Sequence, residues 1–338
     1  MNRKSFATAA SLSILATIFT SCSADEDINQ LNPASASESN AITFRVDNPT
    51  PARSASSREV STSVTDFKVS AIDRGNAYFS SPVSVFQSGG SWTSTGKTYW
   101  PEDRALTFVA FVDQNTYGSS FAISGGTASF TDYEVPSSVN DQTDLMYAVA
   151  SDVRRDSSNG GVSLRFRHAL AQVSFSAQNN SPVYESVEIL SIELGGVKGK
   201  GTYTFPQSST GSAGGSWTLD SDASDRSYSM DNLGVTLGSC DASCRGEKVN
   251  VCGGTRSEND GVMYMIPQQT GDGAYIKVKA RMTLKDVPGA SYETEEIIPV
   301  SANWKEGQRY NYTIAWNATP ITFDVKVADF KEVTVNAD

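Results

Sequence analysis

The chain has 338 residues, of which 19% are charged and 10% aromatic, and its formal net charge is −11. Chains longer than about 250–300 residues usually divide into more than one domain, and a 38% hydrophobic fraction is enough to form cores. An acidic chain without a basic stripe disfavours nucleic acid as a partner. Histidine is the side chain most often used in acid–base catalysis, and the chain has only one, His168. Catalysis by a pair of carboxylates would need no histidine. We therefore do not expect an enzyme.

The N-terminus carries an export signal. Arg3 and Lys4 precede an apolar run, Leu12–Phe19, that is shorter than the roughly 20 residues a membrane-spanning helix needs. Residues 1–21 are therefore predicted to be a signal peptide. The ending FTSC resembles a bacterial lipobox, which predicts acylation (palmitate-type chains) of Cys22 and a lipid anchor in the outer membrane. The alternative is ordinary cleavage beside an incidental cysteine. Without the leader, 25 basic and 38 acidic residues leave a net charge of −13.

A polar tether and a first strand follow. Residues 22–40 are small and polar without periodicity. Their start, SADED, resembles the acidic signal of surface-exported Bacteroidetes lipoproteins, which predicts exposure outside the cell. Ala41–Asn48 then alternates, with Ile42, Phe44 and Val46 on one face, as expected for a half-buried strand.

Short apolar runs between Gly-rich turns predict strands along the rest of the chain. In Leu106–Val112 the alternation breaks down, which suits a strand buried on both faces. A polar break near residue 178 suggests two β-sandwich domains, residues 41–178 and 179–338. The expected strands are Asp66–Asp73, Pro82–Gln87, Leu106–Asp113, Asp144–Ala150 and Val162–Ser176, then Val183–Leu194, Gly201–Phe205, Val262–Pro267, Ala274–Leu284, Tyr292–Val300, Arg309–Trp316 and Ile321–Val327, with Phe330–Val335 as a further candidate.

Three further cysteines, Cys240, Cys244 and Cys252, lie in one Gly/Ser-rich stretch. Their number allows one disulfide and one leftover thiol, and the sequence does not say which pair forms. A zinc site would need a fourth ligand, and His168 is far away in sequence. The acidic stretch from Asp220 lacks the glycine and glutamate of a calcium loop. No metal or cofactor is expected.

His168 lies among apolar residues, so a hydrogen-bonded structural role is favoured over a catalytic one. A competing function is glycan binding, in which exposed tryptophans stack on sugar rings. Exposure of two or more on one face would favour it, and burial of Trp100 and Trp304 would weaken it. The five tryptophans are Trp92, Trp100, Trp217, Trp304 and Trp316.

The order of several short segments resembles the Bacteroidales fimbrillin family, the Mfa-like and FimA-like type V pilins. The segments are ITF from Ile42, TPAR from Thr50, TYWP from Thr98, DLMYA from Asp144, LRFRHALAQV from Leu164, KGTY from Lys200, MIPQ from Met265 and WKEGQRY from Trp304. The resemblance implies an all-β protein of two transthyretin-like (Greek-key) β-sandwich domains behind a lipoprotein signal. It also implies a surface-exposed, outer-membrane fimbrial subunit that serves cell adhesion.

The resemblance also implies an assembly mechanism. An arginine-specific protease cuts the loop after the first strand, that strand leaves, and a strand of another fimbrillin subunit replaces it. The loop NPTPARSASSREV offers Arg53 and Arg58, and we expect cleavage after Arg53. Residues 321–338 either donate a strand to a neighbour or complete their own domain. A lipid-anchored accessory subunit is the alternative role, and the sequence does not identify a host or bacterial surface ligand.

Overall fold

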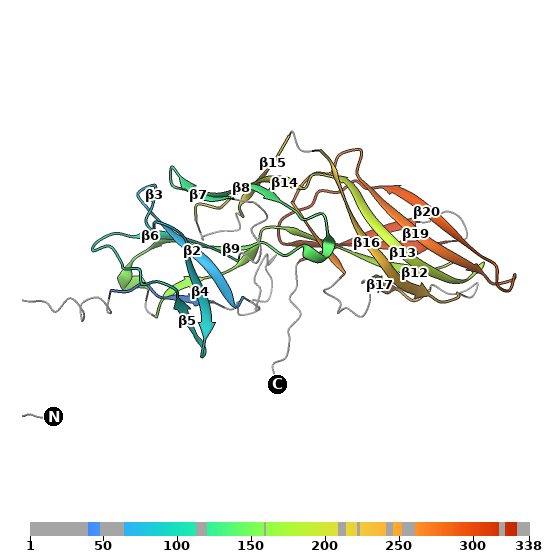
Figure 1. The fold of residues 1–338 in the computed structure, drawn as a ribbon, viewed down its shortest axis with the longest axis horizontal. Coiled ribbons are helices and arrows are strands. Elements are labelled where there is room, and N and C mark those ends of the chain that lie inside the picture. Colours follow the sequence, from blue (N-terminus) through green and yellow to red (C-terminus); the bar gives the residue numbers. More distant parts are fainter. Residues whose placement is uncertain are drawn as a thin grey trace, which may run out of the picture. The chain divides into compact units, whose positions relative to one another are not determined.

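The computed structural model describes residues 40–47, 64–112, 120–158, 160–208, 214–221, 224–240, 246–251 and 261–317, and the backbone of 322–329. The described strands all belong to one compact unit that begins at Asn40 (Figure 1). The predicted signal peptide lies outside the described residues, as does the tether up to Ser39. The described part is built from strands and two 3-10 turns, η1 (Val139–Asp141) and η2 (Arg155–Ser157).

The described strands form five sheets. A two-stranded parallel sheet holds β1 (Phe44–Val46) and β10 (Val162–Leu164). A seven-stranded sheet has the order β11 (Arg167–His168), β9 (Met146–Val153), β6 (Leu106–Val112), β2 (Asp66–Asp73), β4 (Val83–Ser88) and β5 (Ser91–Ser94), with β3 (Asn76–Ala77) beside β2. A four-stranded sheet has the order β15 (Ser216–Leu219), β14 (Lys200–Thr204), β8 (Thr127–Glu134) and β7 (Ser120–Ser124).

The two remaining sheets contain the later strands. A five-stranded sheet has the order β17 (Val249–Val251), β12 (Ala171–Asn179), β21 (Gln308–Trp316) and β22 (Thr322–Asp329), with β18 (Val262–Met265) also paired with β12. A four-stranded sheet has the order β16 (Arg226–Leu237), β13 (Tyr184–Val197), β19 (Tyr275–Leu284) and β20 (Ser291–Pro299). The prediction of an all-β sandwich protein is confirmed.

Strand β6 separates two apolar cores. Val109 and Phe111 belong to a large core, whereas Phe108 and Ala110 belong to a smaller one. Because successive side chains of a strand point to opposite faces, one buried strand can serve both cores. The predicted burial of Leu106–Val112 on both faces is confirmed: six of the seven residues are buried and Thr107 is half-buried.

In strand β13 the alternation of buried and outward-facing residues shifts by one position, and the large core nevertheless stays continuous. Val187 and Ile189 are fully buried, and after a register shift the buried positions become Ile192 and Leu194. An extra residue at such a β-bulge returns the apolar side chains to the same face. Phe175 of the opposite sheet belongs to the same core, so the two sheets pack as a sandwich.

The predicted domain boundary after residue 178 stays a prediction. Strand β12, which ends at Asn179, pairs with β17, β18 and β21. Strand β8 pairs with β14 in the same way across that point in the sequence. Residues on both sides of the boundary therefore share sheets.

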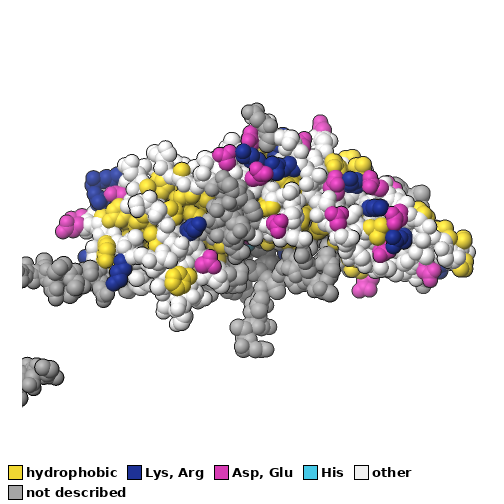
Figure 2. All heavy atoms as spheres, in the orientation of Figure 1, with side chains coloured by type: hydrophobic (Ala, Val, Ile, Leu, Met, Phe, Trp, Pro, Cys, Tyr) yellow, Lys and Arg dark blue, Asp and Glu magenta, His cyan; other side chains and the backbone are white. Residues whose placement is uncertain are grey.

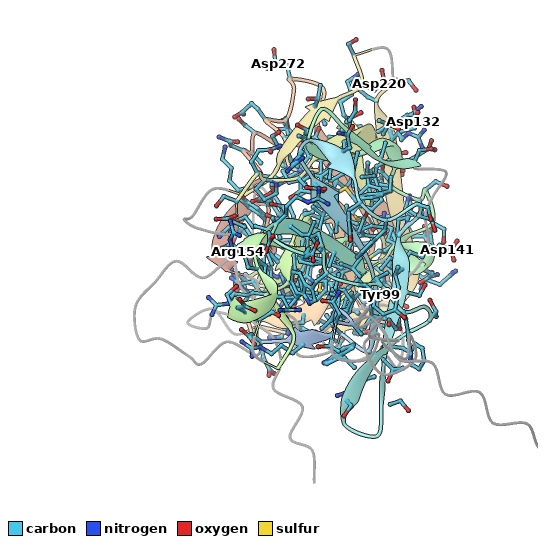
Figure 3. All side chains as sticks on the ribbon, turned by 90° about the vertical axis from the view of Figure 1, so that its left-hand side faces the viewer. Tyr99, Asp132, Asp141, Arg154, Asp220 and Asp272 are labelled. Atoms are coloured by element: carbon cyan, nitrogen blue, oxygen red, sulfur yellow. The ribbon has the colours of Figure 1, made fainter. Side chains whose placement is uncertain are left out.

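Lys200 on β14 links two neighbouring elements. Its Nζ lies 3.0 Å from Asp132 of β8 and 3.9 Å from Asp220, which follows β15. Figure 3 shows these two carboxylates at the same edge of the molecule. The side chains of both ion pairs are partly open to solvent, which screens them, so the pairs contribute little to stability.

The outer face of the β13–β19–β20 sheet carries a ladder of opposite charges, and acidic and basic side chains are interspersed over this region (Figure 2). Arg281 on β19 pairs with Glu188 on β13 and with Glu293 on β20, and Lys279 also pairs with Glu293 at 2.8 Å. Hydrogen bonds from Lys279 and Arg281 lower the pKa of Glu293. This ladder ties three strands together through their side chains.

Lowering the pH is expected to weaken this ladder. The pKa of Glu293 is lower in the folded chain than in the unfolded chain. The ionised Glu293 therefore contributes to stability above the ordinary glutamate pKa of about 4.3, and this contribution is lost as the pH falls through the pKa in the folded chain. Glu293→Gln should therefore lower the urea midpoint of unfolding at pH 7. Between pH 7 and pH 3.5 the midpoint should decrease less in this variant than in the wild type. Glu185→Gln, at an exposed position of β13, is the matched control. Equal pH profiles for both variants would contradict the assignment.

Candidate functional site

The first strand and the groove that holds it form the candidate functional site, which we call the first-strand site. It consists of residues 40–47, β10 and residues 98–100. At its start the chain runs antiparallel to residues 98–100: Ile42 N donates to the Thr98 carbonyl oxygen at 2.8 Å, and Trp100 N donates to that of Asn40 at 3.0 Å.

Strand β1 then pairs in parallel with β10. Val162 N donates to the Thr43 carbonyl oxygen at 2.7 Å, and Asp47 N donates to that of Leu164 at 3.0 Å. The ladder between the two strands spans only three residues of each. Backbone pairing therefore holds the first strand over a short length and from two different parts of the chain.

Apolar side chains add the larger share of the contact. Ile42 and Phe44 are 3% and 5% exposed, and the predicted inward face of this strand is confirmed. The Phe44 ring contacts Phe108 of β6 and Phe67 of β2 edge to face, with ring centroids 5.8 and 6.3 Å apart. Burial of one such side chain contributes about 1.5–3 kcal/mol. Removing the strand would therefore expose the smaller core.

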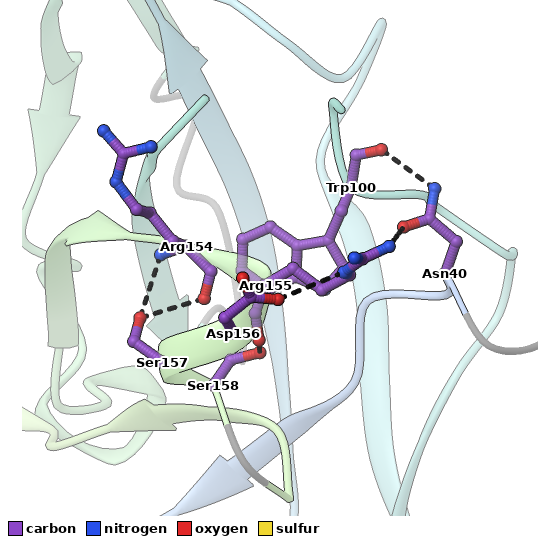
Figure 4. Close-up of polar contacts among 7 residues, drawn as sticks. All are labelled: Asn40, Trp100, Arg154, Arg155, Asp156, Ser157 and Ser158. Carbon is purple, nitrogen blue, oxygen red and sulfur yellow. Dashed lines mark hydrogen bonds and ion pairs between the residues drawn. The ribbon is translucent and has the colours of Figure 1, made fainter. Parts of the chain in front are cut away.

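A polar cluster fixes the start of the strand (Figure 4). The Asn40 side-chain amide donates to the Trp100 carbonyl oxygen at 3.1 Å, and Arg155 donates to Asn40 Oδ1 at 3.4 Å. Arg155 also lies 3.5 Å from Asp156, in an exposed position. Exposed pairs of this kind contribute about 0–1 kcal/mol, so the cluster orients the strand more than it holds it.

Most of the site residues predicted from sequence lie outside the described residues: Cys22, Arg53, Arg58, Cys244 and Cys252. Asp47, the last described residue of the first strand, directly precedes the loop that contains both arginines. Cys240 is fully buried and disulfide-bonded. The sequence leaves the partner of Cys240 open, and Cys244 and Cys252 lie outside the described residues.

His168 has the structural environment predicted for it. The residue is buried, and its Nδ1 forms a hydrogen bond with a carboxylate oxygen of Asp144. The carboxylate belongs to the segment that leads into β9, and His168 lies on the neighbouring β11. The pair therefore links two strands at the edge of the seven-stranded sheet.

The tryptophans do not form an exposed platform. Trp100, Trp304 and Trp316 are buried. Trp92 and Trp217 are half-buried; Trp92 packs on Phe67, and the Trp217 indole N–H donates to the Ala169 carbonyl oxygen at 2.8 Å. By the criterion stated for these residues, this arrangement weakens the glycan-binding hypothesis.

The last described strand pairs within its own chain. Thr322–Asp329 forms β22, which lies antiparallel to β21 over eight residue pairs. This is the arrangement expected of a segment that completes its own sheet. Residues 330–338 lie outside the described residues, and so does the further candidate strand Phe330–Val335.

Two other kinds of site are absent from the described part of the chain. No helix there is long and apolar enough to cross a membrane. Nor does any group of three or more His, Cys, Asp and Glu side chains in those residues have an arrangement that could hold a metal ion.

Two parts of the first-strand site were missed from the sequence. The pairing of β1 with β10 joins segments about 118 residues apart, and the apolar run Val162–Ser176 was expected to be one strand rather than three. Asn40 was placed in the tether. A signal for β10 was present in Val162-Ser163-Leu164, whose alternation matches that of Phe44-Arg45-Val46.

The fold and this site define an all-β sandwich protein whose smaller core is closed by a short N-terminal strand. Residues 57–329 match the family model described as fimbrillin-like. The chain therefore belongs to the fimbrillin-like family, a family of fimbrial and cell adhesion proteins, and the predicted family is confirmed. Among curated proteins, none matches this sequence.

Solved structures show the same fold. A fimbrial protein from Bacteroides vulgatus ATCC 8482 is 16% identical with a TM-score of 0.62, over 86% of this chain and 100% of that chain. A candidate cell adhesion protein from Bacteroides uniformis ATCC 8492 is 14% identical with a TM-score of 0.50, over 86% and 99%. Another from Parabacteroides distasonis ATCC 8503 is 11% identical with a TM-score of 0.50, over 87% and 97%.

Proposed function

We propose that this chain is a fimbrial subunit that is exported as a lipoprotein, lipidated at Cys22, and assembled by protease-triggered strand exchange. An arginine-specific protease cuts after Arg53, β1 leaves, and a strand of another fimbrillin subunit takes its place. The product is a surface fimbrium that serves cell adhesion. Membership of the fimbrillin-like family supports the class of function, and the first-strand site supports the mechanism.

The single observation that supports the mechanism is a contrast within the first-strand site: few backbone hydrogen bonds hold the strand, but its apolar side chains are deeply buried. The backbone ladder of β1 is three residues long, yet Ile42 and Phe44 fill an apolar core. Few backbone bonds make the strand removable once the following loop is cut. An exposed core and the unpaired groups of β10 then strongly favour a replacement strand.

The incoming strand comes from another subunit. Residues 321–338 are the candidate donor in the sequence, but in the structure Thr322–Asp329 pairs with β21 throughout. A donor role requires this strand to leave β21. Among the described strands, β22 lies at the edge of its sheet and pairs only with β21, so its release would break one ladder there.

Two roles compete with the polymerising subunit. A lipid-anchored accessory subunit would keep its N-terminus at Cys22, and the structure is equally compatible with it. A glycan-binding lipoprotein is disfavoured by the tryptophan positions described above. The measurement below separates the first alternative from the proposal.

Arg53→Ala is expected to abolish both processing and fibre formation. The wild-type chain, displayed on its native cell surface and treated with an arginine-specific protease, should gain a new N-terminus at Ser54 and form fibres visible by electron microscopy. Arg58→Ala is the matched control and should leave both results unchanged. Intact-mass analysis that still finds Cys22 at the N-terminus, with no fibres, would overturn the polymerising role and favour the anchored one.

A further inference from the structure

A polar pocket of about 420 Å³ lies beside the first strand. Its wall includes three arginines, Arg45, Arg165 and Arg167, and two aspartates, Asp47 and Asp152. The chain as a whole has a net charge of −11, so a wall in which arginines outnumber carboxylates departs from the general trend. The volume falls in the lower part of the range of small-molecule sites.

Strand periodicity explains why the arginines gather there. Val162, Leu164 and Phe166 point into the smaller core, so the intervening Arg165 and the following Arg167 lie on the opposite face. On β1, the buried Phe44 leaves Arg45 on the outer face in the same way. The first strand and the segment that runs from the end of β10 into β11 therefore present their arginines to one pocket.

The neighbouring groups suit a ligand with several oxygen atoms. Arg45 lies 3.2 Å from Asp47, and the Ser163 hydroxyl donates to the same carboxylate. The hydroxyls of Ser151 and Ser208 lie 3.4 Å apart in the same wall. A guanidinium offers paired donors that match a carboxylate, phosphate or sulfate, and the hydroxyls can bond the rest of such a molecule.

We propose that this pocket binds a small ligand that carries a carboxylate, phosphate or sulfate group, and that the bound ligand holds β1 in place by contacting Arg45 of the strand together with Arg165 and Arg167 of the body. The second half of the inference rests on the proposed release of β1. A ligand that binds only while β1 is in place must oppose its release, because binding stabilises the state to which the ligand binds.

Binding is tested first on the intact chain, where β1 is in place, by isothermal titration calorimetry at low ionic strength. Inorganic phosphate, inorganic sulfate and glucuronate are the anionic probes, and glucose is the neutral match for glucuronate. At least one anion should bind, glucose should not, and added salt should weaken the binding. If phosphate or sulfate binds more tightly than glucuronate, the pocket prefers a phosphate or sulfate group. Tighter binding of glucuronate identifies a carboxylate as the preferred group. Absence of binding by all three anions would overturn the proposal.

Variants then locate the binding. The double variant Arg165→Gln with Arg167→Gln should weaken it at least tenfold, and Arg45→Gln should weaken it as well. Arg154→Gln is the control, because Arg154 bonds the Asp103 carbonyl oxygen and lies outside the pocket wall. Thermal melts confirm that each variant folds. Equal affinity in the wild type and the pocket variants would place the anion elsewhere and overturn the assignment.

Coupling to the first strand is tested on the protease-treated chain by following release of the β1 peptide by mass spectrometry. A saturating anion should slow release at least tenfold in the wild type and have no effect in the Arg45→Gln variant. Unchanged release with proven binding would overturn the coupling. A chain that never releases the peptide would count against the proposed function instead, and the binding measured on the intact chain would still stand.

Discussion

A disulfide between residues 41 and 99 is expected to prevent strand release and fibre growth without preventing cleavage. Ala41 and Tyr99 form an antiparallel bridge, and the backbone bonds lie on either side of it, so they are a non-hydrogen-bonded pair. Such pairs have Cα atoms about 4.5 Å apart, within the range that a disulfide spans. After protease treatment, the variant Ala41→Cys with Tyr99→Cys should retain the first-strand peptide under non-reducing conditions and form no fibres.

Reduction provides the internal control for this experiment. A reductant should free the peptide and restore fibres in the double variant. The wild type with the same reductant controls for the native disulfide at Cys240, and the single variant Ala41→Cys controls for the added thiol. Fibres from the oxidised double variant would show that assembly does not need release of this segment.

Phe44→Ala is expected to have the second large effect. The side chain fills the smaller core between Phe67 and Phe108, and its truncation leaves a cavity that the surrounding strands cannot fill. The free energy of unfolding should fall by about 3 kcal/mol or more. Urea denaturation measures this change. Release of the cut strand should become faster, because Phe44 contributes to the core only while β1 is in place.

The neighbouring residue gives the matched control for Phe44. Thr43 directly precedes β1 and its side chain is exposed, so Thr43→Ala should change the free energy of unfolding by no more than about 0.5 kcal/mol. If both variants have the same stability and the same rate of strand release, Phe44 does not hold the strand in its groove.

Strands with clean alternation were predicted well from the sequence. The strand Asp66–Asp73 has the predicted bounds, and the expected strands at 106–113, 274–284 and 309–316 differ from the structure by one residue at one end. In these segments apolar residues dominate, so the period of two or a continuous buried run is visible locally. The local pattern of apolar residues was sufficient to predict these strands, because the buried side chains are the apolar ones in that pattern.

Strands β8 and β16, which each contain a residue with left-handed backbone, were missed for a physical reason. In β8 the buried residues are Ala128, Phe130 and Tyr133, and the period of two breaks at Asp132, whose φ is +56°. In β16 the buried Met230 and Leu233 flank Asn232, which also has a φ of +56°. The left-handed residue shifts the alternation, so a pattern that assumes a fixed period does not recognise the strand.

The candidate site was half predictable. The alternation of Ile42 and Phe44 was visible in the sequence and correctly gave the buried face. The partner strand β10 was not predictable, because pairing between distant segments depends on the tertiary fold and leaves no local pattern. The arginine pocket was missed for the same reason: Arg45 and Arg165 come together only when β1 lies beside β10.

The charge ladder on β20 also bears on which sheet edges are available for association between subunits. β20 is a nine-residue edge strand, long enough to template unwanted pairing with another chain. Its acidic side chains include Glu295 and also Glu296, which lies opposite the core residue Val278 and so places a carboxylate on the inward side of the edge. Carboxylates at the same places on two copies of this edge would repel each other, which disfavours pairing of β20 with another β20. If β1 is released as proposed, the groove that it leaves is then the less obstructed place for an incoming strand.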